Sequence, residues 1–236
     1  MGLKETISTT TNTLLATAFD TRNGSVVPTT DTVKLSDGAV KVTAVFLYSD
    51  LADSTGLAKN HPRETTAKVI RTYLNAVTRI IRNRSGEIRS FDGDRVMAIF
   101  IGSDAPDRAA KTALEIKWVI DNVVHPKVAS QFASIQNSGW IMKNGTGVDI
   151  SEALMVRGGV RNNSDLVSVG DAPNIAAKLS EYRAYRTYIT DRLWDKMSYS
   201  TCYSSEKKAM WSSPRDLTFG DRIVSIRSSD WGWVVY

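Results

Sequence analysis

The sequence predicts a domain of the α+β class with the ferredoxin-like order βαββαβ, in which helices pack on an antiparallel-rich sheet. Three observations predict it: an alternating apolar segment over residues 40–50, amphipathic helical periods over 62–83 and 106–124, and a hairpin signal between those helices. We expect residues 1–40, rich in Thr, Ser, Asp and Gly, to form an N-terminal arm. Residues 41–236 then form the main domain with a C-terminal extension.

The first strand is predicted over VKVTAVFLYSD, residues 40–50, because apolar side chains occupy both of its alternating faces. This strand ends at Asp50. The polar turn that follows carries hydroxyl groups at Ser54 and Thr55 and free backbone amides, as the start of a helix does. Such a turn can cradle a triphosphate at a helix N-terminus.

Two amphipathic helices are predicted on either side of a hairpin, since apolar residues recur in them at steps of three and four. These residues are Ala67, Ile70, Leu74, Val77 and Ile81 in the first helix, and Ala109, Ala113, Ile116, Ile120 and Val123 in the second. Between the helices, segments 87–91 and 95–100 flank Asp92-Gly93, a pair favoured in two-residue hairpin turns. The second helix is expected to end beside Pro126.

The remaining elements follow the second helix. A glycine-rich extended region covers residues 145–171, a third helix is predicted over 172–185, and TYIT at 187–190 predicts a short strand. A Ser-rich loop and a final alternating segment ending at Tyr236 complete the chain.

Composition limits the classes of function. No apolar run approaches the roughly 18 to 20 residues that span a bilayer, and no signal peptide opens the chain, so we expect a cytoplasmic protein without a membrane partner. The single cysteine, Cys202, excludes intramolecular disulfides and thiolate clusters. The net charge of +5 suits an anionic partner, either nucleic acid or a nucleotide. Basic residues are spread along the chain, which argues against nucleic acid.

Two aspartates are predicted to meet at one edge of the sheet. In the βαββαβ topology the first strand runs antiparallel to the strand after the hairpin, which places Asp50 at the end of one strand beside Asp94 at the start of the other. Paired carboxylates without thiolates are hard oxygen ligands that suit Mg²⁺ or Mn²⁺. The alternative for Asp94 is an ordinary solvated turn.

Three motifs resemble those of class III nucleotidyl cyclases, the superfamily of adenylate and guanylate cyclase catalytic domains. VTAVFLYSDLADSTGLA is similar to the family's strand ending in F-x-D-I-x-G-F/S-T, and GEIRSFDGDRVMAIF to its second metal motif. SDLVSVGDAPNIAAKLSE resembles the third motif, D-Y-x-x-x-G-D-x-V-N-x-A-A-R-L. The motifs occur in the family's order over about residues 40–192.

The resemblance implies the roles of individual residues. Asp50, the adjacent Leu51 and Asp94 would hold two metal ions, and Asn174 would position the ribose. Lys178 stands where the family has an arginine that stabilises charge on the α-phosphate; lysine keeps the charge but lacks the bidentate fork. In the family, the ribose 3'-hydroxyl attacks the α-phosphorus and gives a 3',5'-cyclic nucleotide and pyrophosphate.

The resemblance also implies a head-to-tail homodimer. The family's active site forms between two catalytic domains, of which one gives the metal aspartates and the other the asparagine and the cation. This chain carries both sets of residues. Two copies would therefore form two equivalent sites.

The positions that read the base depart from the purine pattern. Adenylate-specific relatives carry Lys at the position of Ser90 and Asp or Thr at that of Val167, and guanylate-specific ones tend to have Glu at the first. Tyr48 shares the face of Asp50 and offers a phenol to a smaller base. Arg89 replaces the lysine only if the strand register slips.

Two further arginines are candidates for contact with phosphate. Arg95 follows Asp94 directly, and Arg222 lies in the C-terminal segment, where relatives use a lysine. An ordinary surface charge is the alternative for both arginines.

The short, stand-alone layout resembles the pyrimidine cyclases of bacterial Pycsar anti-phage systems, whose cyclic UMP or cyclic CMP activates a separate effector. We therefore expect UTP as the substrate, with CTP as the second choice. The alternatives are an adenylate or guanylate cyclase with atypical base contacts, and a degenerate cyclase domain that binds nucleotide as a module.

Overall fold

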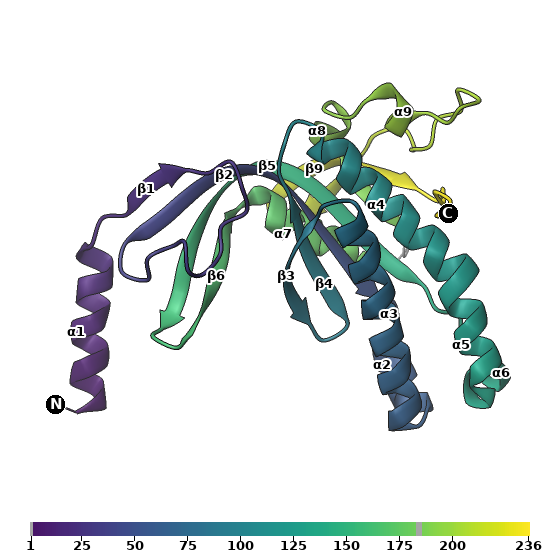
Figure 1. Ribbon diagram of the computed structural model, residues 1–236, viewed down its shortest axis with the longest axis horizontal. Coiled ribbons are helices and arrows are strands. Elements are labelled where there is room, and N and C mark those ends of the chain that lie inside the picture. Colours follow the sequence, from purple (N-terminus) through teal and green to yellow (C-terminus); the bar gives the residue numbers. More distant parts are fainter. Residues whose placement is uncertain (1, 183–185) are drawn as a thin grey trace.

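The computed structural model describes residues 2–182 and 186–236. Nine strands form one mixed sheet with the order β3-β4-β2-β5-β7-β9-β8, while β1 pairs with β2 and β6 with β5 (Figure 1). The strands are β1 Asp20–Asn23, β2 Gly38–Leu51, β3 Glu87–Asp92, β4 Arg95–Phe100, β5 Asn144–Val160, β6 Asn163–Gly170, β7 Thr187–Thr190, β8 Arg215–Phe219 and β9 Arg222–Ser229. The β1–β2 and β5–β7 pairs are parallel, and the other strand pairs are antiparallel.

The helices cover both faces of this sheet. They are α1 Leu3–Ala16, α2 Ser54–Asn60, α3 Arg63–Asn83, α4 Ala105–Val119, the π-helical turn η1 Ile120–Val124, α5 His125–Gln131, α6 Ala133–Ser138, α7 Asp171–Ser180, α8 Asp191–Trp194 and α9 Tyr199–Cys202. Helices α3 and α4 pack on Val45 and Leu47 of β2, whereas Ala172 and Ala176 of α7 pack on its opposite face beside Phe46. Within the described ranges, no helix is both long and apolar enough to cross a membrane.

The order β2-α3-β3-β4-α4-β5 confirms the predicted α+β class and its βαββαβ core. Strand β2 is the central strand of that core and pairs antiparallel with both β4 and β5. Because both faces of β2 are covered, nearly all of its residues from Val42 to Leu51 are apolar or buried. This placement puts the end of β2 beside the start of β4, as the topology predicts.

The apolar stripe of α3 differs from the predicted one. Of the predicted residues, Val77 and Ile81 are buried, Ile70 and Leu74 pack partly buried against the core, and Ala67 is exposed. Val69 and Tyr73 are also fully buried. Tyr73 belongs to the buried face because its hydroxyl hydrogen-bonds the Ser49 hydroxyl at 2.9 Å in the core. The periodic pattern did not count this tyrosine as a core residue, and the predicted stripe was wrong at Ala67.

The hairpin turn and the end of the second helix also differ from prediction. Asp92 pairs with Arg95, so the two-residue turn is Gly93-Asp94, and Gly93 supplies the left-handed backbone with φ 61°. The helix does not end beside Pro126: after Val119 the chain stays helical through the π turn η1 and into α5, which has Pro126 in its first turn. Asp94 is therefore a turn residue at the tip of the hairpin.

Helix α7 lies very close to β5. A β-carbon added to Gly145 would overlap the carbonyl oxygen of Ser180, and one added to Gly147 would overlap that of Ala176. These glycines let the helix backbone rest directly on the strand. The third helix predicted over 172–185 ends at Ser180, and its residues 183–185 lie outside the described ranges.

The segment that precedes β2 contains α1 and β1. Every residue of α1 is exposed, and Figure 1 shows this helix standing apart from the sheet at the N-terminal end. Strand β1 adds a parallel pairing to the beginning of β2, from Gly38 to Lys41. Of these two elements, β1 is the one that joins the sheet.

The contact between α7 and β5 generates a prediction about stability. Gly147→Ala should destabilise the fold by about 3 kcal/mol. The added β-carbon would overlap the backbone carbonyl of Ala176, which cannot move aside as the end of a flexible side chain can. Urea unfolding followed by circular dichroism measures this change. Gly158→Ala in the same strand is the matched control, since its nearest neighbour is a Val167 methyl group at 3.2 Å. Equal loss of stability in both variants would contradict the close packing of α7.

Candidate functional site

The structure brings the two predicted carboxylates together at one edge of the sheet. In the β2–β4 ladder Asp50 lies opposite Arg95, and Asp94 is the residue before it in the turn. Burial first, and the negative charge of Asp94 second, raise the pKa of Asp50 to about 6. The two groups are therefore close enough to repel each other in a partly buried place.

The surroundings of these carboxylates fit a divalent cation. One oxygen of Asp94, Oδ2, is buried and has no hydrogen-bond partner in the described part of the chain. A buried carboxylate oxygen without a partner is costly, and a metal ion removes that cost. Leu51 follows Asp50, and both residues line a cavity at this edge of the sheet. Among residues 2–182 and 186–236, no group of three or more His, Cys, Asp or Glu side chains forms a metal site, so side chains alone would leave coordination positions free.

A cavity of about 330 Å³ adjoins Asp50 and contains the predicted phosphate turn. It is lined by residues 50–55 together with Ser180 and Glu181, and so includes the hydroxyls of Ser54 and Thr55. Asp53 at the start of α2 has a left-handed backbone, and its carboxylate lies against Gly56. A triphosphate would meet three carboxylates here. It therefore needs cations as well as backbone amides.

Arg95 is partly buried in an ion network rather than free on the surface. Its guanidinium bonds Asp92 at 2.9 Å and also bonds Glu181, the residue after α7. The same group lies 5.7 Å from the centre of the Tyr48 ring, and burial raises the pKa of Tyr48. Sequence reasoning missed Glu181, whose only signal was its place at the end of the third motif.

Asn174 and Lys178 lie on the exposed side of α7. The amide of Asn174 donates to the carbonyl of Gly170 at 3.1 Å, and the ammonium of Lys178 lies 5.6 Å from the centre of the Phe219 ring. Neither residue lines the cavity that contains Asp50, and among the described residues no hydrogen bond or ion pair joins this pair to Asp50 or Asp94. One chain thus holds the two predicted sets of residues apart.

Arg222 is paired with an acidic residue. It donates two hydrogen bonds to Asp171 at the start of α7, at 2.6 and 3.0 Å, and these bonds lower the pKa of Asp171. Both residues line a cavity of about 270 Å³ that also contains Arg192. Arg192 is anchored by the fully buried carboxylate of Asp149.

The base-reading positions contain a β-bulge. The register of the β3–β4 pair shifts between Ile88 and Ser90, so Arg89 is the extra residue. Its guanidinium lies 3.5 Å from the carboxylate of Asp165 in β6, two residues before the half-exposed Val167. Ser90 itself stays paired with Met97 in the hairpin register, and the Asp165 partner of Arg89 was not foreseen.

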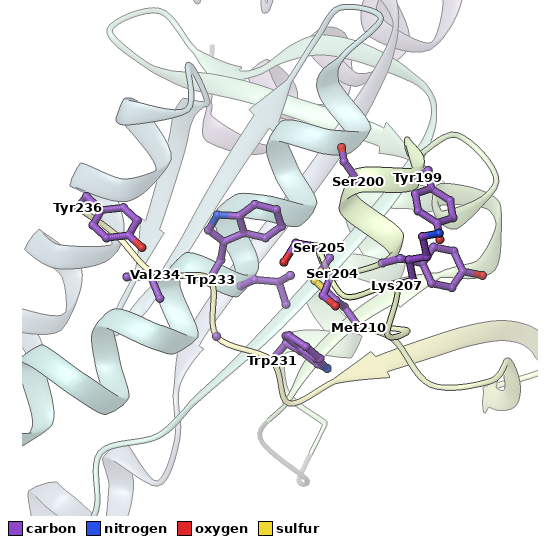
Figure 2. A pocket seen from close by; sticks show the side chains of 13 residues that line it. Tyr199, Ser200, Ser204, Ser205, Lys207, Met210, Trp231, Trp233, Val234 and Tyr236 are labelled. Carbon is purple, nitrogen blue, oxygen red and sulfur yellow. The ribbon is translucent and has the colours of Figure 1, made fainter.

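A third cavity, of about 640 Å³, lies between the α9 region and the C-terminal segment (Figure 2). Its walls are largely aromatic and include Trp231, Trp233 and the stacked rings of Tyr199 and Tyr203. None of the predicted site residues lines it. The C-terminal tryptophans are therefore separate from the carboxylate pair.

Comparisons with known proteins agree with this geometry. No protein-family model matches the chain. The chain is 35% identical to a uridylate cyclase of Rhodovulum sp. (strain MB263) over 98% of both chains, and 34% identical to one of Xanthomonas perforans over 99% of both. The crystal structure of the guanylyl cyclase Cya2 superposes with a TM-score of 0.66 at 17% identity, covering 83% of this chain and 95% of that one. The chain therefore belongs to the uridylate cyclase family of class III nucleotidyl cyclases.

Proposed function

We propose that this protein converts UTP to 3',5'-cyclic UMP and pyrophosphate, with CTP as the second substrate to be tested. The observation that carries this proposal is the Asp50–Asp94 carboxylate pair, with its unpartnered buried oxygen, in a chain whose full-length relatives are named uridylate cyclases. The product would serve as a signal to a separate effector in defence against phage, as the resemblance to Pycsar cyclases implies.

Asp50, Asp94 and the backbone at Leu51 would hold two Mg²⁺ or Mn²⁺ ions. When bound, these ions supply positive charge that acidifies the attacking ribose hydroxyl and balances the leaving pyrophosphate. Desolvation already makes the charged form of Asp50 unfavourable, so its carboxylate gains more from a cation than an exposed aspartate does. Ser54 and Thr55 then face the phosphates from the adjoining cavity.

Separation of the two residue sets within one chain supports the head-to-tail homodimer. Asn174 and Lys178 are exposed on α7 and project away from the side that packs on the sheet. A second copy would place this pair opposite the metal carboxylates of the first. Asn174 would then orient the ribose, and Lys178 would stabilise charge on the α-phosphate as a point charge.

Base choice would depend on the bulged Arg89 and its partner Asp165 in place of the purine readers. Ser90 and Val167 offer neither a cation nor a carboxylate. An arginine donor beside a carboxylate acceptor complements the edge of uracil, whose N3–H donates between two carbonyl acceptors. Tyr48 would narrow the site from the face of Asp50, which favours the smaller pyrimidine ring.

A four-nucleotide assay tests the function. Purified protein with Mn²⁺ and each of ATP, GTP, CTP and UTP should release cyclic UMP as the main product, measured by mass spectrometry. Arg89→Ala should lower the preference for UTP by about tenfold, because it removes the proposed donor to a uracil carbonyl. A cyclic purine as the main product would contradict the pyrimidine claim. Release of no pyrophosphate from any of the four would leave only a nucleotide-binding module.

Asp50→Asn should abolish cyclic nucleotide formation and yet stabilise the metal-free protein. The pKa of Asp50 is about 6 in the fold and near 3.9 when unfolded, so the folded state loses stability as the pH rises through this window. The variant should gain about 1 kcal/mol at pH 7.5 after allowance for solvent screening, and almost nothing at pH 4. Urea unfolding at both pH values, with the exposed Asp195→Asn as control, measures this gain.

Mixing two inactive variants tests the shared site. Asp94→Asn removes a metal carboxylate and Asn174→Ala removes the ribose contact, so each variant should be inactive alone. Random mixing gives half heterodimers, each with one intact site, and should restore about a quarter of wild-type specific activity. No recovery after verified subunit exchange would mean that both residue sets act within one chain.

A further inference from the structure

Arg95 connects the hairpin that carries Asp94 to the end of helix α7. From the first residue of β4 it bonds Asp92 across the turn and Glu181 directly after α7. About a fifth of its side chain is exposed, at 22%, so the guanidinium is largely enclosed between its two partners and the Tyr48 ring. A single side chain thus ties three segments together beside the carboxylate pair.

The hydrogen bonds of Arg95 go to neither of the two metal carboxylates. Asp50 lies directly opposite Arg95 in the strand register, but the hydrogen bonds of the guanidinium go to Asp92 and Glu181. Oδ2 of Asp94 remains buried and unpartnered. Arg95 therefore does not occupy the place of a cation at this pair. Its two acidic partners compensate its charge at a short distance from the site.

Glu181 provides a fixed anchor for this ion pair. The carbonyl of the preceding residue, Ser180, lies where Gly145 of β5 has no β-carbon, so the end of α7 rests on the centre of the sheet. The hairpin has weaker support, because β3 is the edge strand and its pairing with β4 is interrupted by the bulge at Arg89. The Arg95–Glu181 ion pair therefore connects the well-packed end of α7 to the less well-packed hairpin turn.

We propose that Arg95 and Glu181 are positioning residues that hold the turn bearing Asp94 against the end of β2. The ion pair keeps Asp94 and Asp50 at the separation at which one cation can be shared. This inference rests on the proposed metal site. Glu181 also lines the cavity beside Asp50, but the proposal gives neither Arg95 nor Glu181 a part in the bond-forming step.

Glu181→Gln tests the proposal, because it keeps the length of the side chain and removes its charge. We expect the Kd for Mn²⁺ without nucleotide, measured by electron paramagnetic resonance of the free ion, to rise about three- to fivefold. Amide hydrogen exchange of residues 91–95 should accelerate by a similar factor. Glu181→Asp should fall between Glu181→Gln and the wild type.

Glu152→Gln is the matched control, since it breaks the exposed Lys41–Glu152 pair of 3.5 Å on the other side of β2 and should change neither quantity. Unchanged Mn²⁺ binding or unchanged hairpin exchange in Glu181→Gln would overturn the proposal. Weaker binding with unchanged exchange would make Glu181 a direct ligand, and tighter binding would make Arg95 a competitor of the metal. If the wild type makes no cyclic nucleotide, the proposed function is wrong. The Kd for Mn²⁺ and the hydrogen exchange of residues 91–95 would still test the role of the ion pair.

Discussion

The structure depends on holding two carboxylates side by side at a partly buried edge of the sheet, where Arg95 hydrogen-bonds Asp92 and Glu181 instead of either of them. Asp50 closes the central strand and Asp94 occupies a two-residue turn, so backbone geometry on both sides limits how far they can move apart. Their repulsion and burial disfavour ionisation, as the raised pKa of Asp50 records. The fold tolerates this strain because the adjoining core of β2, covered on both faces, is extensive.

The arginines around the Asp50–Asp94 pair are each bonded to other acidic residues. Arg95 is satisfied by Asp92 and Glu181, Arg222 by Asp171, and Arg192 by Asp149. Each of these arginines is paired inside the chain and held in one position. The unbalanced groups are carboxylates at the edge of the sheet. Such an arrangement attracts small hard cations first and anionic phosphate only after them.

The sequence was sufficient for the order of elements and for the meeting of Asp50 with Asp94, because alternation, helical period and the βαββαβ topology are local or rule-bound signals. It was insufficient where a pair far apart in sequence decides the outcome. The Tyr73–Ser49 hydrogen bond adds a tyrosine to the buried face of α3, and Arg89 at the bulge pairs with Asp165. The Glu181 contact joins residues 86 positions apart, and no periodic pattern encodes such a pair.

The ten residues of α7 serve more than one purpose. Its buried side is pressed onto two glycines of β5, its last turn leads to Glu181 beside the carboxylate pair, and its exposed side carries Asn174 and Lys178. In the proposed dimer, Glu181 lies at one active site, and Asn174 and Lys178 of the same helix region lie at the other. A substitution in α7 would therefore affect both active sites of the dimer. The sequence of this helix should change more slowly in evolution than that of the exposed α1.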